Sequence, residues 1–253
     1  MPPFIATTTA RYGPSPCQSG DLLLPVQKPA PVVCLLHGGF WRVPHGREQW
    51  QAVAKDLARR GYAVWNIGYR RLGEPGGGWP GTFEDVAAGI AQLAELARHL
   101  PIDPGRVAVV GHSAGGLLAL WAAAQPQASE SGVRIRALAA LAPVADLARA
   151  WELGLGQGAV AELLGGSPAE RPAPYAGAAP PAGRAKGIRQ AIFHGSQDRA
   201  VPIDLSRGFV QADHAAGGAI ELVELEGAGH MDFLDPGSTA HAALCEWLSR
   251  ELR

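Results

Sequence analysis

From residue 31 onward, the sequence alternates short apolar runs with longer amphipathic segments, and no other feature constrains the fold as strongly. Nearly continuous apolar runs are typical of strands that are buried on both faces of a parallel sheet. The predicted strands are 31–36, 62–67, 106–111, 134–141, 188–195 and 219–226, and the predicted helices are 46–60, 82–100, 113–125, 203–217 and 237–252. This order predicts an α/β fold with a mostly parallel central sheet and helices on both faces.

Two segments depart from the alternation. The first 25 residues contain the alternating stretch FIATTTARY and the apolar run DLLLP, which predict an antiparallel hairpin at the edge of the sheet. Residues 143–187 combine the helix-like stretch GAVAELLGG with a Pro/Ala-rich stretch, and the prolines favour an ordered, irregular path over the surface. We therefore expect one domain over residues 1–253, with 143–187 as a small inserted lid.

The composition limits the partners of the chain. Hydrophobic residues make up 47% and charged residues 18%, as in ordinary globular proteins. The formal net charge is −1 without a basic run, which argues against nucleic acid or an anionic membrane as a partner. No apolar run approaches the ~18 residues that span a bilayer, and the first residues lack the pattern of a secretory signal. We expect a cytoplasmic protein that acts on a small molecule.

The three cysteines, Cys17, Cys34 and Cys245, are far apart and odd in number. Their spacing supports neither a disulfide framework nor a zinc motif, so we expect no metal site. Cys34 lies in the run PVVCLL, where a cysteine behaves as a small buried apolar residue.

The stretch GHSAGG places Ser113 between a predicted strand and a predicted helix, in a G-x-S-x-G pattern. A serine on such a turn is held in a strained backbone, and small neighbours let the helix approach the strand. Gly111, Ala114, Gly115 and Gly116 are small in this way. The simpler alternative is a serine that only caps the helix. The context favours a nucleophile.

The stretch LLHGGFW follows the predicted strand 31–36. Its glycines allow backbone N–H groups of Gly38 and Gly39 to face a cavity and form half of an oxyanion hole, with the N–H of Ala114 as the other half. The alternative is a glycine turn without chemistry. We expect His37 to fix this loop through hydrogen bonds.

An acidic residue, Asp198 in the stretch HGSQDRAVP, follows the predicted strand 188–195. Catalytic groups gather at the carboxyl ends of strands in open α/β sheets, which favours Asp198 as the acid of the site. Two alternatives remain: Asp198 forms only an Asx turn or a helix cap, or Asp146 in the stretch APVADL is the acid.

His230, in the stretch EGAGHMDF, follows the predicted strand 219–226, and small neighbours let its ring project toward the site. We expect it to be the general base. The other candidates are less suitable: His99, His214 and His241 fall in predicted helices, His45 lies in a loop, and His112 points away from Ser113. The chain order Ser113, Asp198, His230 is that of α/β hydrolases, and all three follow strands.

Together, HGGFWR, GHSAGG, HGSQDRAVP and GAGHMDF resemble the small bacterial carboxylesterases and kynurenine-formamidase-like enzymes of the α/β-hydrolase superfamily, from about residue 30 to the C-terminus. The resemblance implies that Ser113 is acylated, that His230 acts as base and then acid, and that Asp198 orients it. It implies neither metal nor organic cofactor. Phe40 stands where related lipases have a third glycine, which predicts a stiffer loop.

The substrate is less constrained. Phe40, Trp41 and Trp79 could form an apolar wall for an aryl group, or Trp41 and Trp79 could only pack the loops. The leading hypothesis is a hydrolase of small or aryl carboxylic esters. The alternatives are an arylformamidase that cleaves N-formylkynurenine and, from another class, a silent ligand-binding protein with this fold. A homodimer is expected only from the resemblance.

Overall fold

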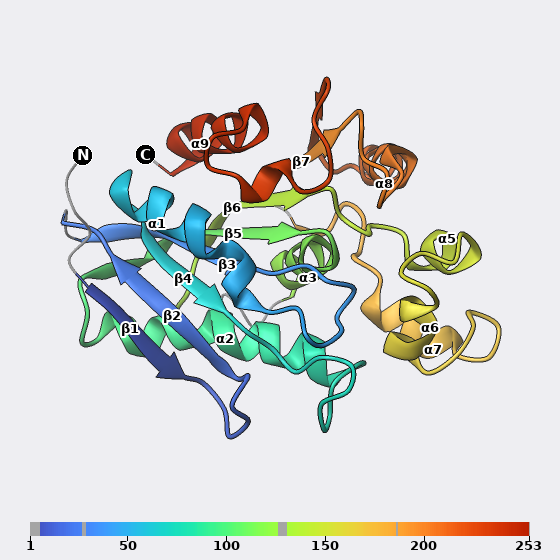
Figure 1. The fold of residues 1–253 in the computed structure, drawn as a ribbon, viewed down its shortest axis with the longest axis horizontal. Coiled ribbons are helices and arrows are strands. Elements are labelled where there is room, and N and C mark those ends of the chain that lie inside the picture. Colours follow the sequence, from blue (N-terminus) through green and yellow to red (C-terminus); the bar gives the residue numbers. More distant parts are fainter. Residues whose placement is uncertain (1–5, 27–28, 126–130, 186, 253) are drawn as a thin grey trace.

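The computed structural model describes residues 6–26, 29–125, 131–185 and 187–252. Its centre is an eight-stranded sheet with the order β1-β2-β4-β3-β5-β6-β7-β8 (Figure 1). The strands are β1 (Ala6–Arg11), β2 (Ser19–Leu24), β3 (Ala30–Leu36), β4 (Ala63–Ile67), β5 (Ile102–His112), β6 (Ile135–Leu141), β7 (Arg189–Gly195) and β8 (Glu221–Leu225). Strands β3 to β8 are parallel, which confirms the predicted fold class.

The predicted N-terminal hairpin is present, since β1 and β2 pair antiparallel and β1 is an edge strand. Strand β2 also pairs antiparallel with β4 and so joins the hairpin to the parallel sheet. Residues 1–5 of the hairpin segment and residue 186 of the predicted lid lie outside the described residues.

Helices cover both faces of the sheet (Figure 1). The 3₁₀ helix η1 (Arg47–Trp50), α1 (Gln51–Arg59), η2 (Asp232–Leu234) and α9 (Thr239–Glu251) pack on one face. On the other face lie α2 (Gly81–Ala97), α3 (Ala114–Ala123) and α8 (Ile203–Ala215). None of the helices in the described ranges is long and apolar enough to cross a membrane.

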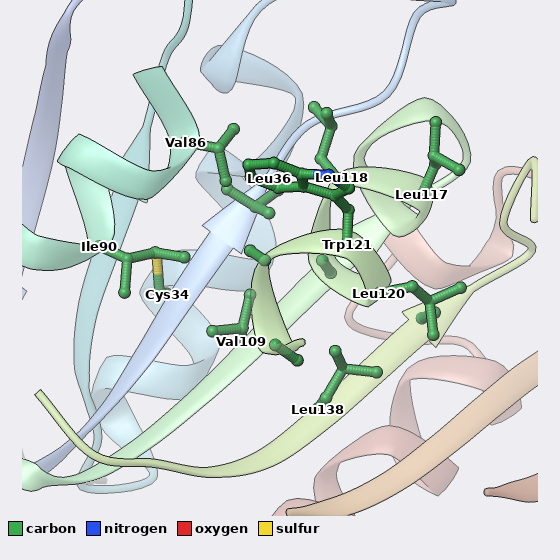
Figure 2. Packing of buried hydrophobic residues seen from close by; sticks show 14 of the residues in the cluster. Cys34, Leu36, Val86, Ile90, Val109, Leu117, Leu118, Leu120, Trp121 and Leu138 are labelled. Carbon is green, nitrogen blue, oxygen red and sulfur yellow. The ribbon is translucent and has the colours of Figure 1, made fainter. Parts of the chain in front are cut away.

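The parallel strands divide their side chains between two apolar layers. In β3, Cys34 and Leu36 face α2 and α3, whereas Val33 and Leu35 face the layer of α1 and α9. Figure 2 shows the first layer, where the side chains of β3, β5 and β6 meet Leu118 and other residues of α3. Full burial of one such side chain contributes about 1.5–3 kcal/mol. Burial raises the pKa of the Cys34 thiol, and this cysteine is the buried apolar residue that its sequence context predicts.

The predicted lid segment forms three short helices, α5 (Leu147–Glu152), α6 (Ala159–Leu164) and α7 (Pro172–Ala178). They lie together beyond the carboxyl ends of β5 and β6 (Figure 1). The Pro/Ala-rich stretch is therefore less irregular than expected. Helix α7 begins at Pro172, and a proline is tolerated in the first turn because the N–H that it lacks has no partner within the helix.

Candidate active site

Ser113 lies on the turn between β5 and α3, with φ 55° and ψ −117°. A side chain at positive φ is strained by on the order of 1–3 kcal/mol, and such strain concentrates at functional sites. The side chain of Ser113 does not cap α3, so the capping alternative does not account for the serine. The backbone is fixed from both sides, because the Ser113 N–H donates to the Leu141 carbonyl at 2.8 Å and the Gly116 N–H donates to the Ser113 carbonyl at 2.9 Å.

The glycines around Ser113 are required by close backbone contacts. A Cβ atom on Gly111 would lie 2.0 Å from the carbonyl oxygen of Gly115, and one on Gly115 would lie 2.3 Å from the carbonyl oxygen of Leu36. The start of α3 therefore touches both β5 and β3. Any side chain at either glycine would move the helix and the turn that carries Ser113.

Asp198 and His230 are brought together from two different loops. The Nδ1 atom of His230 donates to Oδ2 of Asp198 at 2.6 Å. The Asp198 side chain is 1% exposed and that of His230 is 14% exposed. The other carboxylate oxygen, Oδ1, accepts hydrogen bonds from the N–H groups of Ala200 and Val201 at 2.8 and 2.9 Å. Asp198 thus forms the Asx turn and also holds His230.

The pKa of Asp198 lies well below its usual range. Burial alone would raise it, but hydrogen bonds from His194, from His230 and from the Val201 N–H outweigh burial and stabilise the carboxylate. A carboxylate only accepts hydrogen bonds, so Nδ1 of His230 carries the proton. In the neutral ring Nε2 is then the basic nitrogen, which is the tautomer that a general base needs.

The rival acid, Asp146, has a structural contact instead. It is exposed, and its side chain accepts the Arg149 N–H at 2.9 Å as the N-cap of α5. The geometry therefore favours Asp198 over Asp146 as the partner of His230.

The stretch His37–Arg42, which we call the HGGFWR loop, lies against the Ser113 turn. A Cβ atom on Gly38 would lie 3.2 Å from Cβ of Ser113. Three consecutive residues, Gly39, Phe40 and Trp41, have positive φ values of 101°, 48° and 58°. The indole N–H of Trp41 donates to the Ala114 carbonyl at 3.2 Å, which ties the loop to the first residue of α3. This contact and the approach of Gly38 to Ser113 hold the loop against the start of α3, and the oxyanion role of Gly38, Gly39 and Ala114 stays a prediction.

His37 anchors the beginning of this loop. Its ring stacks on Tyr69 with centroids 4.1 Å apart, and the Tyr69 hydroxyl donates to the His37 carbonyl at 2.6 Å. Its Nδ1 donates to the Gly38 carbonyl at 2.9 Å. Burial lowers the pKa of His37 to about 3, so the ring is neutral. A neutral, buried ring suits the structural role expected for it.

His112 belongs to the site, although the sequence analysis set it aside. Its Nε2 donates to the backbone carbonyl of His230 at 2.8 Å, and the two ring centroids are 4.6 Å apart. Burial, followed by the nearby His230 ring, lowers the pKa of His112 to about 3. The G-x-S-x-G pattern carries no signal for this contact, because it specifies nothing about what the second residue touches.

The three aromatic residues proposed to contact a ligand differ in burial. Trp41 is fully buried, so the packing alternative describes its position. Trp79 is half-buried and packs edge-on against Phe83 and Trp121, with centroids 4.9 and 6.4 Å away. Phe40 is also half-buried.

The HGGFWR loop is tied to the α5–α7 segment. Phe40 lies against Gly156, where a Cβ atom would be only 2.4 Å from its ring. The Arg42 guanidinium donates to both carboxylate oxygens of Glu162 at 2.8 and 2.6 Å. It also donates to the carbonyls of Gly156 at 2.6 Å and Gln157 at 3.1 Å. The loop that carries Gly38 and Gly39 is therefore held against α6 and the residues before it by Arg42. We call these contacts of Arg42 the clamp.

The sheet topology, the strand-to-helix turn that carries Ser113 and the pair of His230 with Asp198 fit an α/β-hydrolase fold. The chain belongs to the BD-FAE family, whose model matches residues 21–212.

Curated relatives carry esterase names. The chain is 28% identical over 239 residues to a probable isoprenylcysteine alpha-carbonyl methylesterase of Oryza sativa subsp. japonica, covering 87% of this chain and 57% of that protein. It is 30% identical over 265 residues to the esterase LipC of Mycobacterium tuberculosis, covering 91% of this chain and 62% of that protein. The chain thus spans somewhat more than half the length of these relatives.

Solved structures share the fold over nearly the whole chain. A thermophilic esterase of Thermogutta terrifontis matches with a TM-score of 0.71 at 25% identity, covering 96% of this chain and 90% of that one. A truncated carbohydrate esterase from gut microbiota matches with a TM-score of 0.83 at 19% identity, covering 98% and 96%. At 19% identity the second match shows the fold alone.

Proposed function

We propose that the protein is a serine hydrolase that cleaves small or aryl carboxylic esters through an acyl-enzyme. The observation that carries the proposal is the 2.6 Å contact between His230 and the carboxylate of Asp198, at the sheet edge where Ser113 is held at positive φ. The esterase names of the relatives support the same class of reaction.

In the first step, Nε2 of His230 takes the proton of the Ser113 hydroxyl as its oxygen attacks the ester carbonyl carbon. The carbonyl oxygen becomes an oxyanion, which the N–H groups of Gly38, Gly39 and Ala114 stabilise. One such donor contributes about 3 kcal/mol to the transition state. His230 then protonates the leaving alcohol, and the acyl group stays on Ser113.

In the second step, His230 activates a water molecule that attacks the acyl carbon, and Ser113 recovers its proton as the acid is released. Asp198 keeps the His230 proton on Nδ1 and stabilises the imidazolium that forms in both steps. These steps need no metal and no organic cofactor.

Apolar side chains on the segments that follow the strand ends support a small apolar substrate. Met231 follows His230 in the chain and is 58% exposed, and Trp151 and Leu153 near the end of α5 are exposed as well. We propose that these side chains, with Phe40 and Trp79, offer apolar surface for an acyl or aryl group. The helices α5–α7 are only six or seven residues each, which suits a lid over a small substrate better than an oil-binding surface.

A cytoplasmic location and a homodimer belong to the same proposal. The free state of Cys17, Cys34 and Cys245 supports a reducing compartment. Gel filtration of the purified protein tests the dimer.

The test compares kcat/KM for p-nitrophenyl acetate and for N-formylkynurenine, with Ser113→Ala as the control. We expect the acetate to be hydrolysed faster and the variant to be inactive on both substrates. A preference for the formamide of about 100-fold, or about 2.7 kcal/mol, would replace the ester with an aryl formamide as the substrate. A folded protein that is inactive on both would overturn the proposal in favour of a silent ligand-binding protein.

A further inference from the structure

A second group of reactive side chains lies between α1 and α9, in the apolar layer on that face of the sheet. Asp56 comes from α1, and His241 and Cys245 lie one turn apart on α9, so both face the same neighbour. One ligand atom from each residue lies within 4.8 Å of the other two; His241 and Cys245 are buried, and the Asp56 side chain is 13% exposed. His241 is the most enclosed, with no exposed surface.

The three side chains converge on one nitrogen atom. Nε2 of His241 lies 2.8 Å from Oδ2 of Asp56 and 3.2 Å from Sγ of Cys245. Burial would raise the pKa of Asp56, but hydrogen bonds from Arg60 and His241 lower it overall, so Asp56 is a carboxylate. Because a carboxylate only accepts, the proton between them sits on Nε2. The proton on Nε2 of His241 thus points to a carboxylate oxygen and lies near a thiol sulfur, and a metal cation can take its place.

The distances fit a tetrahedral metal ion with little movement. Zinc bonds of about 2.0 Å to oxygen and nitrogen and 2.3 Å to sulfur place the ligand atoms about 3.3–3.5 Å apart. The observed separations of 2.8 and 3.2 Å from Nε2 of His241 therefore need to expand by less than about 1 Å, and the Asp56 and Cys245 ligand atoms, which are within 4.8 Å of each other, must lie at a similar spacing. A mixed oxygen, nitrogen and sulfur set is the kind that zinc accepts.

Access to the group is provided by a cavity of about 490 Å³, whose lining includes Cys245, Arg60 and Ser249. Of the three proposed ligands, Cys245 is the one that lines it. Pro31 and Arg106 line the same cavity near the amino ends of β3 and β5. Ser113 follows the carboxyl end of β5. The cavity therefore opens at the end of the strands that is opposite to the proposed active site.

Two cations oppose metal binding. Arg60 donates to Oδ2 of Asp56 at 2.6 Å, and its side chain is 43% exposed, so it can turn toward solvent. Arg106 lines the cavity and adds further positive charge. A metal ion must displace Arg60, release the Cys245 thiol proton and take the place of the proton on Nε2 of His241, which can move to Nδ1. The loss of the thiol proton makes binding stronger at higher pH.

We propose that Asp56, His241 and Cys245 form a zinc-binding site that joins α9 to α1. The two ends of the site are 185 residues apart, which is why cysteine spacing alone could not indicate it. The site is separate from Ser113, so zinc is predicted to act on the stability of the fold and not on the chemical step.

The test titrates tag-free, chelator-treated protein with Zn²⁺ by calorimetry and measures Tm with and without the metal. We expect one site per chain and a higher Tm with zinc. Cys245→Ser and His241→Asn should each weaken binding by at least about tenfold. Cys17→Ser is the matched control, because Cys17 is a thiol outside the group and should leave binding unchanged.

Two further measurements make the result specific. Co²⁺ in place of Zn²⁺ should give a thiolate-to-cobalt charge-transfer band in the native protein but not in Cys245→Ser. Arg60→Gln, which removes the competing cation, should tighten binding. Failure of the native protein to bind Zn²⁺, or equal binding by Cys245→Ser, would overturn the proposal, whatever the esterase assay shows.

Discussion

The ring of His112 donates a hydrogen bond of 2.8 Å from Nε2 to the backbone carbonyl of His230. The residue beside the proposed nucleophile therefore holds the loop that carries the proposed base. Because His112 is buried and neutral, it acts on position and not on charge. The contact joins the end of β5 to a loop that follows β8, two strands that do not pair with each other.

Replacing His112 tests this contact. His112→Leu removes the donor, so kcat should fall by about tenfold or more while KM changes little, since the base is misplaced but the pocket is not. His112→Gln keeps an N–H donor and should recover part of the loss. The pH profile of kcat/KM should shift in His112→Leu. If His112→Leu and His112→Gln lowered Tm equally and left kcat unchanged, His112 would be a packing residue without a role in positioning His230.

The same substitution, Asp to Asn, at position 198 and at position 146 shows which of the two acids supports His230. Asp198→Asn should lower kcat by about 10⁴-fold, because the amide favours the wrong tautomer of His230. Asp146→Asn keeps an oxygen that caps α5 and should leave kcat nearly unchanged. Steady-state kinetics on p-nitrophenyl acetate decide the matter. The reverse order of effects would make Asp146 the acid.

The clamp between Arg42 and the α5–α7 segment predicts unequal effects of its two partners. Glu162 is 54% exposed, and exposed ion pairs contribute about 0–1 kcal/mol, so Glu162→Gln should have a small effect. Arg42→Gln also removes the hydrogen bonds to two carbonyls, each of which contributes about 1.5–3 kcal/mol when the donor is charged.

We therefore expect kcat/KM to fall at least about tenfold in Arg42→Gln, because the HGGFWR loop loses its support. Arg149→Gln, which breaks a pair between Arg149 and Glu152 within α5, is the control. If Glu162→Gln had the larger effect, the ion pair and not the carbonyl contacts would support the loop.

Buried neutral histidines predict a loss of stability in mild acid. Burial lowers the pKa of His37 and His112 from 6.5 to about 3. Below pH 6.5 the unfolded chain binds protons that the native protein cannot bind, so the free energy of unfolding decreases as the pH falls toward 3. Each histidine contributes a slope of about 1.4 kcal/mol per pH unit. Asp198, whose pKa is lowered by its hydrogen bonds, adds to the loss in stronger acid.

Urea unfolding at several pH values between 7 and 4.5 measures this slope. His37→Gln should flatten it by about 1.4 kcal/mol per pH unit, the contribution of one group. His99→Gln is the control, since the His99 side chain is 73% exposed. An unchanged slope in His37→Gln would show that this ring is protonated in the native protein.

Sequence periodicity predicts most of the sheet because strands buried on both faces are continuous apolar runs. Strand β5 is a partial exception, starting at Ile102 and not at Arg106. The stretch Asp-Pro-Gly after Ile102 resembles a turn. In the structure it is part of β5, and the register of β5 with β3 shifts at this stretch, between Pro31 and Val32 of β3. Helix α7 was missed because prolines are read as helix breakers, although the first turn tolerates them.

Motifs placed the predicted site residues at the right strand ends, but they could not reveal contacts across the fold. Nothing in the sequence connects His112 to the His230 carbonyl, or Arg42 to α6, because both contacts depend on how loops pack. The same limit applies to Trp41, which is fully buried and donates its indole N–H to the Ala114 carbonyl. The sequence places His241 only in a predicted helix, and the approach of α1 to α9 brings Asp56 to it.

The most direct test of the central claim is covalent labelling of Ser113. The protein is incubated with an aryl phosphonate, an electrophile that mimics the ester, and the modified peptide is identified by mass spectrometry. We predict one adduct per chain on the peptide that contains Ser113, with loss of esterase activity in proportion to labelling. Ser113→Ala should stay folded, unlabelled and slower by about 10³-fold or more. Labelling at another residue, or full esterase activity in Ser113→Ala, would contradict the account.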